Sequence, residues 1–327
     1  MKQSQFEKRY QTLWMEMEAL LGSKPKSAAK SKEWKAARRG FPEKYRRICA
    51  HLAVARDRNY SVTLIQKLED LALRSHQLLY GARGGTKVRV IKYFLNDFPA
   101  LIRKEWKLVS LSCVLLFGFM GVMIYISMKN PHIPYMVLGE DSLARFEAMY
   151  DPAARHLGEA RDAESDVMMW AHYINNNVGI DFACFASGIF VGIGSIFFMV
   201  FNGLYIGLIA GHLTNAGCSS TFWPFVSGHS ALELFAAALS GAAGMKMGLS
   251  LLMPGRRTRA DAFKEGAAVA ARILYGAATM TFLAAFIEAF WSSRVDLTVG
   301  IKYGFGGFMW LLVFWYFGFC GRHHATE

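Results

Sequence analysis

Long apolar runs distinguish the second two-thirds of the chain from its charged N-terminal third. Helical segments of roughly 20 apolar residues cross a hydrocarbon core about 30 Å thick. Five windows have this character, at 106–128, 180–200, 223–253, 267–291 and 304–319. A sixth run, 203–218, is shorter. The pattern predicts an all-α, polytopic helical membrane protein.

The N-terminal third has apolar residues at three- and four-residue steps, which place them on one face of a helix. Further helical patterns cover 42–55 and 61–79, after the linker "GSKPKSAAKSK" and before the break "YGARGG". We therefore expect a helical domain at 1–104 and a transmembrane domain at 105–327. The first helix face is formed by Phe6, Tyr10, Leu13, Trp14, Met17, Leu20 and Leu21.

The segment "TKVRVIKYFLNDFPALIRKEWK", 86–107, ends the N-terminal domain with an amphipathic pattern. Its apolar residues form one stripe, and its basic residues lie mostly off that stripe. This pattern is typical of a helix lying on the cytoplasmic leaflet near anionic headgroups. A soluble helix docked on the membrane bundle is the alternative. The stripe is Ile91, Phe94, Leu95, Phe98, Leu101 and Ile102.

The charge distribution orients these segments. Residues 1–107 contain 24 Lys and Arg against 10 Asp and Glu, whereas 131–177 contain 3 against 8. Because cytoplasmic segments are enriched in basic residues, we expect the N-terminal domain inside and 131–177 outside. The charged start of the chain does not resemble a cleaved secretory signal.

The basic stretch "RRTRADAFK", 256–264, should also be cytoplasmic, so the windows at 180 and 223 both run inward. They require an outward crossing between them, and only 203–218 is available. We therefore expect about six crossings with both termini cytoplasmic, the third one short, tilted or broken near Asn202. A re-entrant hairpin at 203–218 is the alternative.

Small residues recur at four-residue spacing in the apolar windows. Such residues allow close approach of helix backbones in lipid, where hydrophobic burial does not drive association. We expect the third and fourth crossings to be central in a helix bundle. The packing glycines are Gly188, Gly192, Gly203, Gly207, Gly211, Gly244 and Gly248.

Composition excludes several function classes. The basic N-terminal third precedes a membrane span, and its apolar residues are needed for packing, so nucleic-acid binding is not expected. The five cysteines are scattered without CxxC spacing, which favours buried thiols over a disulfide framework or zinc ribbon. GxSxG, P-loop and HExxH motifs are absent, so common hydrolase and ATPase chemistry is not indicated.

Polar residues inside the apolar windows are the candidate site. His229 and Glu233 lie one helical turn apart on one face, in the predicted outer half of the membrane. Glu288 and His212 reach the same depth on other predicted spans. Asn176, Asn177 and Asp181 mark the outer entrance of the second span, and Asn202 lies near the start of the short third crossing.

Three interpretations of this cluster remain open. The first is a hydrogen-bonded tie that fixes helix register. The second is a transport or ion-relay site, and the third is a metal or catalytic site. Histidine and carboxylate ligands suit zinc, although the HExxH spacing is missing. Lys246 and Arg272 lie deeper toward the cytoplasm and are expected to snorkel or to pair with helix ends.

Several stretches together resemble one known family. They are "FLNDFPALIRKEW", "INNNVGIDFACFASGIFVGIGS", "FNGLYIGLIAG", "GHSALELFAAALSGAAGMKMG" and "AAFIEAFW", between about Tyr93 and Trp291. Their order and spacing resemble the stage II sporulation protein M family of integral membrane proteins. His229 and Glu233 match the family motif, although Gly228 and Ser230 replace its proline and glycine. The recurrent polar positions of the family are matched by Asn176, Asn202 and Glu288, but not by His212.

The resemblance implies a non-enzymatic scaffold or component of a membrane complex linked to cell-envelope processes. The founding member recruits wall-degrading partners during spore engulfment, and other members occur in prokaryotes that do not sporulate. We expect a multi-pass protein of the prokaryotic cell membrane, a homo-oligomer with a dimer favoured, in contact with lipid and other envelope proteins. No cofactor is expected. The alternatives are a channel or transporter for a small ion or solute and a metal-dependent membrane enzyme.

Overall fold

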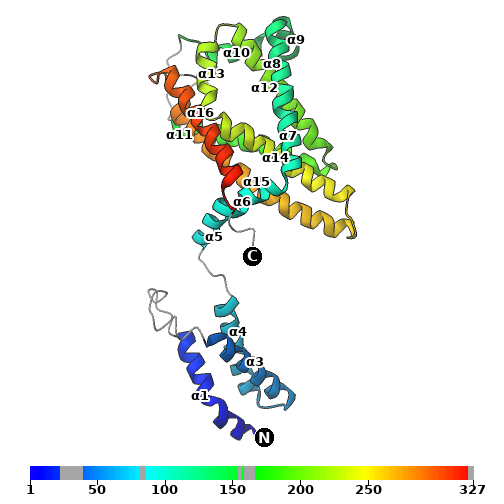
Figure 1. Ribbon diagram of the computed structural model, residues 1–327, viewed down its shortest axis with the longest axis vertical. Helices are drawn as coiled ribbons and strands as arrows, with labels where there is room; N and C mark the ends of the chain where they lie inside the picture. The colour runs from blue at the N-terminus through cyan, green and yellow to red at the C-terminus, as the bar shows by residue number, and fades with distance from the viewer. Residues whose placement is uncertain (23–39, 81–85, 154–156, 158–165, 323–327) are drawn as a thin grey trace. The chain divides into compact units, whose positions relative to one another are not determined.

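The computed structural model describes residues 1–22, 40–80, 86–153, 157 and 166–322. All regular elements in these ranges are helices, which confirms the all-α prediction. The chain forms two compact units, Met1–Arg89 and Val90–Glu327 (Figure 1). The predicted linker at 22–32 and the break at 80–85 fall almost entirely outside the described residues.

The first unit is a small helical bundle of α1 (Gln3–Gly22), α3 (Phe41–Asp57) and α4 (Val62–Tyr80). Its core includes Phe6, Trp14 and Met17 from the predicted face of α1. Trp14 Nε1 donates a hydrogen bond of 3.1 Å to Nδ1 of the buried His51. Burial lowers the pKa of His51, and the nearby positive charge of Arg47 lowers it further.

The amphipathic segment is helical as α5 (Thr86–Lys92), a π-helical turn η2 (Tyr93–Asp97) and α6 (Phe98–Lys104). Residues 90–104 belong to the second unit instead of the N-terminal one. Phe98 is fully buried, and the close approach of its ring to the backbone of Gly276 explains the glycine there. Arg103 Nη1 donates to the carbonyl of Phe317 over 2.8 Å. These contacts pack α6 against the helices of the second unit, while Ile91 and Leu95 remain exposed.

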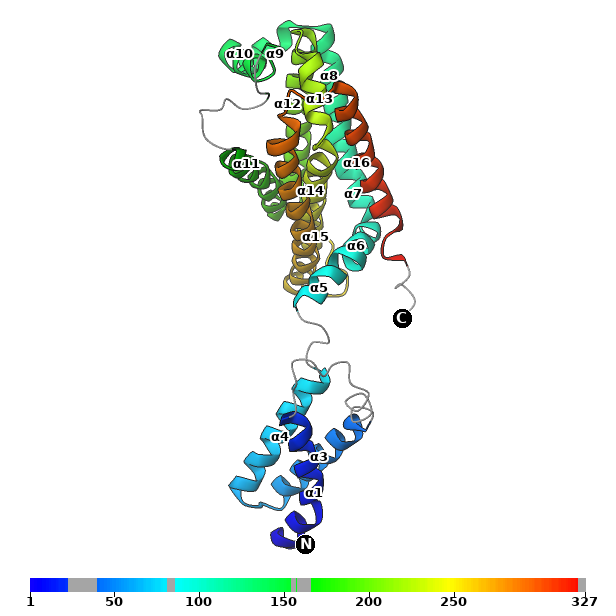
Figure 2. The same ribbon diagram turned by 90° about the vertical axis from the view of Figure 1, so that its left-hand side faces the viewer.

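Four helical segments in the described chain are long and apolar enough to cross a membrane. They are Trp106–Lys129, which comprises α7 (Trp106–Cys113), η3 (Val114–Gly118) and α8 (Phe119–Lys129); α12 (Ile193–Asn215); α14 (Ser230–Leu252); and α15 (Arg259–Ile287) with its π-helical end η5 (Glu288–Ser292). Two further helices of 21 residues, α11 (Asp166–Ala186) and α16 (Val299–Phe319), pack beside them (Figures 1 and 2).

The expected continuous crossing at 180–200 is wrong. α11 ends at Ala186, a 3-10 turn η4 (Ser187–Ile189) follows, and α12 begins at Ile193. The chain reverses through positive φ angles of 59° at Val191 and 84° at Gly192. Hydropathy does not detect this reversal because the turn residues are themselves apolar or small. Close contact with α14 accommodates the turn inside the bundle.

The third crossing, expected to be short, tilted or broken near Asn202, is neither short nor broken. α12 is an uninterrupted helix of 23 residues, and the Asn202 side-chain amide donates to the carbonyl of Phe198 in the preceding turn over 2.7 Å. The window 223–253 is interrupted instead. It contains the end of α13 (Ser219–Ser227), a break at Gly228 and His229, and α14.

Glycines form two close helix contacts in the second unit. A Cβ at Gly203 or Gly207 would lie 2.5 Å from a carbonyl oxygen of the 106–129 segment. On the other side, a Cβ at Gly188 would lie 2.2 Å from the carbonyl oxygen of Gly244, and one at Gly248 would lie 2.0 Å from the Gly192 nitrogen. The α11–α12 turn is therefore seated directly on α14. Gly211 approaches Ser127, and Gly192 approaches Met245.

These contacts also define helix directions. Gly203, Gly207 and Gly211 approach Leu116, Met120 and Ser127 in the same order, so α12 runs parallel to 106–129. α14 runs antiparallel to α12, because Gly241 meets Met199 while Ser230 and Ile209 border one cavity.

The remaining helices also alternate in direction along the chain. α11 is antiparallel to α15, since Asn177 contacts Glu288 and Asp181 contacts Thr281. α14 and α15 are antiparallel as well, with Gly266 against Ser250 at one end and the carboxylates of Glu233 and Glu288 together at the other. α16 runs from the Glu288 end of the bundle back toward α6.

Two short helices, α9 (His132–Leu138) and α10 (Glu140–Met149), follow α8 inside the acidic segment 131–177. His212 at the end of α12 lies 2.7 Å from Glu147 of α10, with Tyr135 of α9 packed edge-on against its ring. The Thr221 hydroxyl donates to the carbonyl of Tyr150. Thus α9 and α10 dock on the end of the bundle formed by α12 and α13.

Candidate functional site

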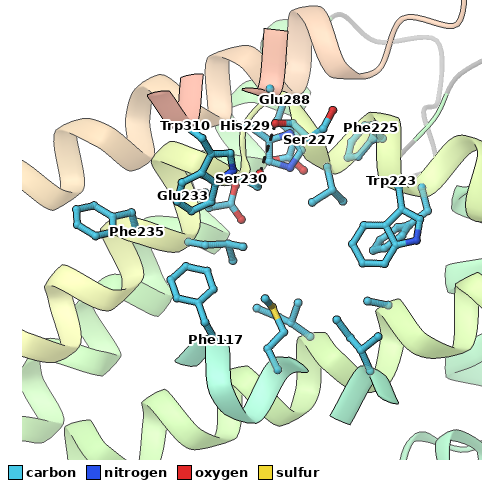
Figure 3. Close-up of a pocket in the computed structure, with 18 of the residues that line it drawn as sticks. Phe117, Trp223, Phe225, Ser227, His229, Ser230, Glu233, Phe235, Glu288 and Trp310 are labelled. Carbon is cyan, nitrogen blue, oxygen red and sulfur yellow. Dashed lines mark hydrogen bonds between the residues drawn. The ribbon is translucent and has the colours of Figure 1, made fainter. Parts of the chain in front are cut away.

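His229, Glu233 and Glu288 come together at two helix irregularities. His229 occupies the break before α14, and Glu233 lies in the first turn of that helix. Glu288 opens the π-helical turn η5 at the end of α15. One metal-ligand atom from each side chain lies within 4.8 Å of the other two (Figure 3). This triad is the central polar feature of the candidate site.

The surroundings orient two members of the triad. His229 Nδ1 lies 3.0 Å from the Ser292 hydroxyl, and its ring packs edge-on against Phe225. Asn177 Nδ2 donates to Glu288 Oε2 over 3.4 Å. Glu233 differs, because its Oε2 atom is buried without a hydrogen-bond partner among the described residues. A buried polar atom of this kind is costly unless it serves a ligand, an ion or a proton.

The triad lies on the wall of a cavity of about 800 Å³. The cavity is bounded by α7, η3, α8, α10, α12, α13, α14, η5 and α16, and its lining is mostly apolar and aromatic. Figure 3 shows the triad facing the space bordered by Phe117, Trp223 and Trp310. We call this space the apolar chamber. Its volume is in the range of cavities that hold drug-sized molecules.

The other residues of the predicted cluster are not part of the triad, although Asp181 is close enough to Glu233 for their charges to interact. His212 is paired with Glu147 near α10, and Asn202 donates to Phe198 and toward the Cys184 sulfur inside the bundle. Asn176 donates to the Asn177 side chain over 2.8 Å, and Asn177 in turn donates to Glu288. Asp181 accepts a 2.5 Å hydrogen bond from Thr281 between α11 and α15.

Comparison with protein families identifies the chain. The family model described as stage II sporulation protein M (SpoIIM) matches residues 111–293, more than half of the sequence. The chain belongs to the SpoIIM family. A second model, described as a domain of unknown function (DUF8413), matches residues 4–81 in the first unit. Neither the curated proteins nor the solved structures contain a match.

The match to the SpoIIM family includes all three residues of the triad and the first-unit match includes none. The sequence resemblance to stage II sporulation protein M is therefore confirmed, and the chain is a membrane protein of that family. The triad and most of the chamber lie within the SpoIIM match, whereas the whole α16 wall lies beyond it.

Sequence reasoning did not identify Lys302 or Ser292. Lys302 of α16 is only 3% exposed, and its ammonium donates to the carbonyl of Ser292 over 2.8 Å. Ser227 in turn donates to the Lys302 carbonyl. The available signal was a single lysine two residues before an apolar window, which resembles an ordinary flanking residue of a span. Its burial depends on the return of α16 against α13 and η5.

The site offers one imidazole and two carboxylates at the edge of an apolar volume. Two carboxylates this close in low-dielectric surroundings need a shared proton or a cation. With a proton the triad can donate a hydrogen bond to a polar group inside the chamber. With a bound cation it presents a positive centre to that group. The arrangement therefore combines recognition of a small polar group with burial of an apolar chain.

Proposed function

We propose that six helical segments of this protein cross the prokaryotic cell membrane, with both termini cytoplasmic. The segments are 106–129, α11, α12, α14, α15 with η5, and α16. Their alternating directions support this topology, as do 21-residue lengths of α11 and α16, about 30 Å each. The basic 256–264 segment and the acidic 131–177 segment support the orientation.

A thiol-accessibility experiment tests the topology. A cysteine at Asn215, in a chain otherwise free of cysteine, is expected to react with a membrane-impermeant reagent from outside intact cells. Labelling only after the cytoplasmic side is opened would contradict an outward crossing by α12.

We propose that the protein binds an amphipathic molecule within the membrane. The observation that carries this proposal is the apolar chamber of about 800 Å³ with the triad on its wall. The apolar lining would hold an alkyl or isoprenoid chain, and His229, Glu233 and Glu288 would hold its polar head. An ion path through the chamber is less favourable than binding of an amphipath. An ion that lost its water shell there would meet mainly apolar side chains.

Gly307 provides a way to fill the chamber. It lines the cavity on α16, and a Cβ built there meets nothing within 4 Å. Gly318 also has open space around its Cβ position on the same helix, but it is not a lining residue. The pair Gly307→Phe and Gly318→Phe therefore adds the same side chain inside and outside the chamber.

The probe is a fatty acid carrying a photoactivatable diazirine near the end of its chain, added to the full-length protein in lipid nanodiscs. We expect cross-links at lining residues such as Phe117 and Trp310 in the wild type and in Gly318→Phe. Gly307→Phe should lose most of this labelling. Equal labelling in all three proteins would contradict occupation of the chamber.

We also propose that the protein is a non-enzymatic component of a membrane complex, with a homodimer as its basic form. A compact first unit with its own core, matched by a family model distinct from SpoIIM, supports a separate docking module. Mild detergent extraction followed by mass photometry should detect particles heavier than one chain. A single-chain mass across the accessible concentration range would contradict this proposal.

A further inference from the structure

The triad also has the donor set of a metal site. We propose that His229, Glu233 and Glu288 bind one divalent transition-metal ion, with zinc as the best chemical match. One imidazole nitrogen and two carboxylate oxygens are ordinary zinc ligands, and this set is less suited to the all-oxygen preference of magnesium or calcium. The three donor atoms are close together in space, although Glu288 lies 55 residues after Glu233 in the sequence.

The distances between the three donor atoms are close to those that a zinc ion requires. Zinc bonds of about 2.0–2.2 Å put tetrahedral ligands about 3.4 Å apart. The ligand atoms here lie within 4.8 Å of one another, so each has to move inward by about 1 Å or less, which rotation of the glutamate side chains allows. The separation of the three donors is therefore close to a binding geometry.

Charge gives an independent argument. Two glutamates and a neutral histidine carry two negative charges, which one divalent cation neutralises inside apolar surroundings. In the described residues Glu233 has no ion pair, and its Oε2 atom is buried without a hydrogen-bond partner. The nearby Lys302 does not fill this role, because its ammonium donates to the Ser292 carbonyl. A bound cation would satisfy the carboxylate that the fold leaves unpaired.

The surrounding hydrogen bonds are those expected around metal ligands. A histidine ligand commonly donates its second ring N–H to a neighbouring acceptor. The tautomer of His229 that carries its proton on Nδ1 donates to Ser292 over 3.0 Å and leaves the Nε2 lone pair for the metal. Asn177 similarly holds one oxygen of Glu288. Among the three ligands in this part of the chain, Glu233 is the one whose Oε2 atom has no hydrogen-bond partner.

Three protein ligands leave a fourth position of a tetrahedral ion for an exchangeable ligand. Since the triad borders the apolar chamber, a water molecule or the head group of an amphipath would take this position. The metal site itself depends only on the three side chains and stands whether or not the chamber binds an amphipath.

The test uses the full-length protein in detergent, stripped with a chelator and then equilibrated with Zn²⁺ or Co²⁺. We expect one equivalent of zinc by elemental analysis and the visible absorption of tetrahedral Co²⁺. Glu233→Gln and His229→Ala should lose both signals. His212→Gln is the matched control, because His212 is also a buried histidine beside a glutamate but lies outside the triad.

Ser292→Ala separates metal binding from misfolding, because it removes no ligand. It should bind zinc about 10–100-fold more weakly, as loss of an orienting hydrogen bond does at other metal sites. Zinc should also raise the unfolding temperature of the wild type but not of a monodisperse Glu233→Gln protein. Less than about a tenth of an equivalent in the wild type would overturn the proposal, as would equal binding by Glu233→Gln. Neither result depends on the fatty-acid cross-linking that tests the chamber.

Discussion

Replacing Gly248 by alanine should open the contact between α14 and the α11–α12 turn. The new Cβ would lie 2.0 Å from the Gly192 nitrogen and 2.3 Å from the Gly188 carbonyl oxygen, whereas ordinary contact begins at 3.4 Å. Both opposing atoms belong to the backbone and cannot rotate away, so the helix and the turn must separate. Overpacking typically costs about 1–3 kcal/mol, and the backbone contact places this substitution near 3 kcal/mol.

Thermal unfolding of the detergent-solubilised protein, followed by tryptophan fluorescence at one fixed scan rate, measures this cost. At about 2–4 °C per kcal/mol for a unit of this size, Gly248→Ala should lower the apparent Tm by about 6–12 °C. Gly179→Ala in α11 is the control, because a Cβ there meets nothing within 4 Å. Alanine should leave that variant at or slightly above the wild-type Tm. Equal Tm values for the two variants would refute the assignment of close backbone packing at Gly248.

Three further predictions follow from single contacts. Because burial lowers the pKa of His51 below its ordinary 6.5, the unfolded chain takes up a proton first as pH falls. The first unit should therefore lose stability below about pH 6.5, and His51→Gln should reduce this dependence in hydrogen exchange of α1 and α3. Lys246→Ala leaves the Glu105 side chain, only 11% exposed, without its 2.8 Å ion pair and should cost about 1–3 kcal/mol in thermal unfolding. Adding Glu105→Gln should restore part of that loss, and an additive double variant would contradict the coupling. Thr258→Ala removes the side-chain acceptor for the Asp261 N–H at the start of α15, so amide exchange there should accelerate by the equivalent of about 1 kcal/mol.

The sequence was sufficient to predict helix content and most apolar segments, because these depend on local composition. Segment ends in the middle of the bundle were not predictable in the same way. The reversal at Val191 and Gly192 occurs inside a continuous apolar run, and it packs closely against Gly244 and Gly248 of α14. Hydropathy assigned one crossing to residues that belong to α11, a turn and α12. For the same reason, the crossing that the structure shows as α12 (193–215) was predicted as the shorter segment 203–218.

The candidate site was predictable only where its residues share a helix. His229 and Glu233 are one turn apart in sequence, so their common face could be inferred directly. Glu288 was placed near them by depth, and the structure brings it there. His212 was placed at the same depth by the same reasoning, yet it pairs with Glu147. Predicted membrane depth gives the height of a residue along the bundle axis, but not which neighbouring helix its side chain faces. Tertiary packing determines that neighbour.

The irregular backbone at the triad bears on whether these residues form a register tie or a ligand site. A tie requires that its polar atoms satisfy one another, whereas Glu233 Oε2 remains buried and unpartnered beside a large cavity. Both supporting helices also depart from regular geometry at this level, at the break before α14 and in the π-helical turn η5. Such π-helical turns are frequent at functional sites. Two helix irregularities that direct an unsatisfied carboxylate and its neighbours toward one chamber favour a ligand site over a structural tie.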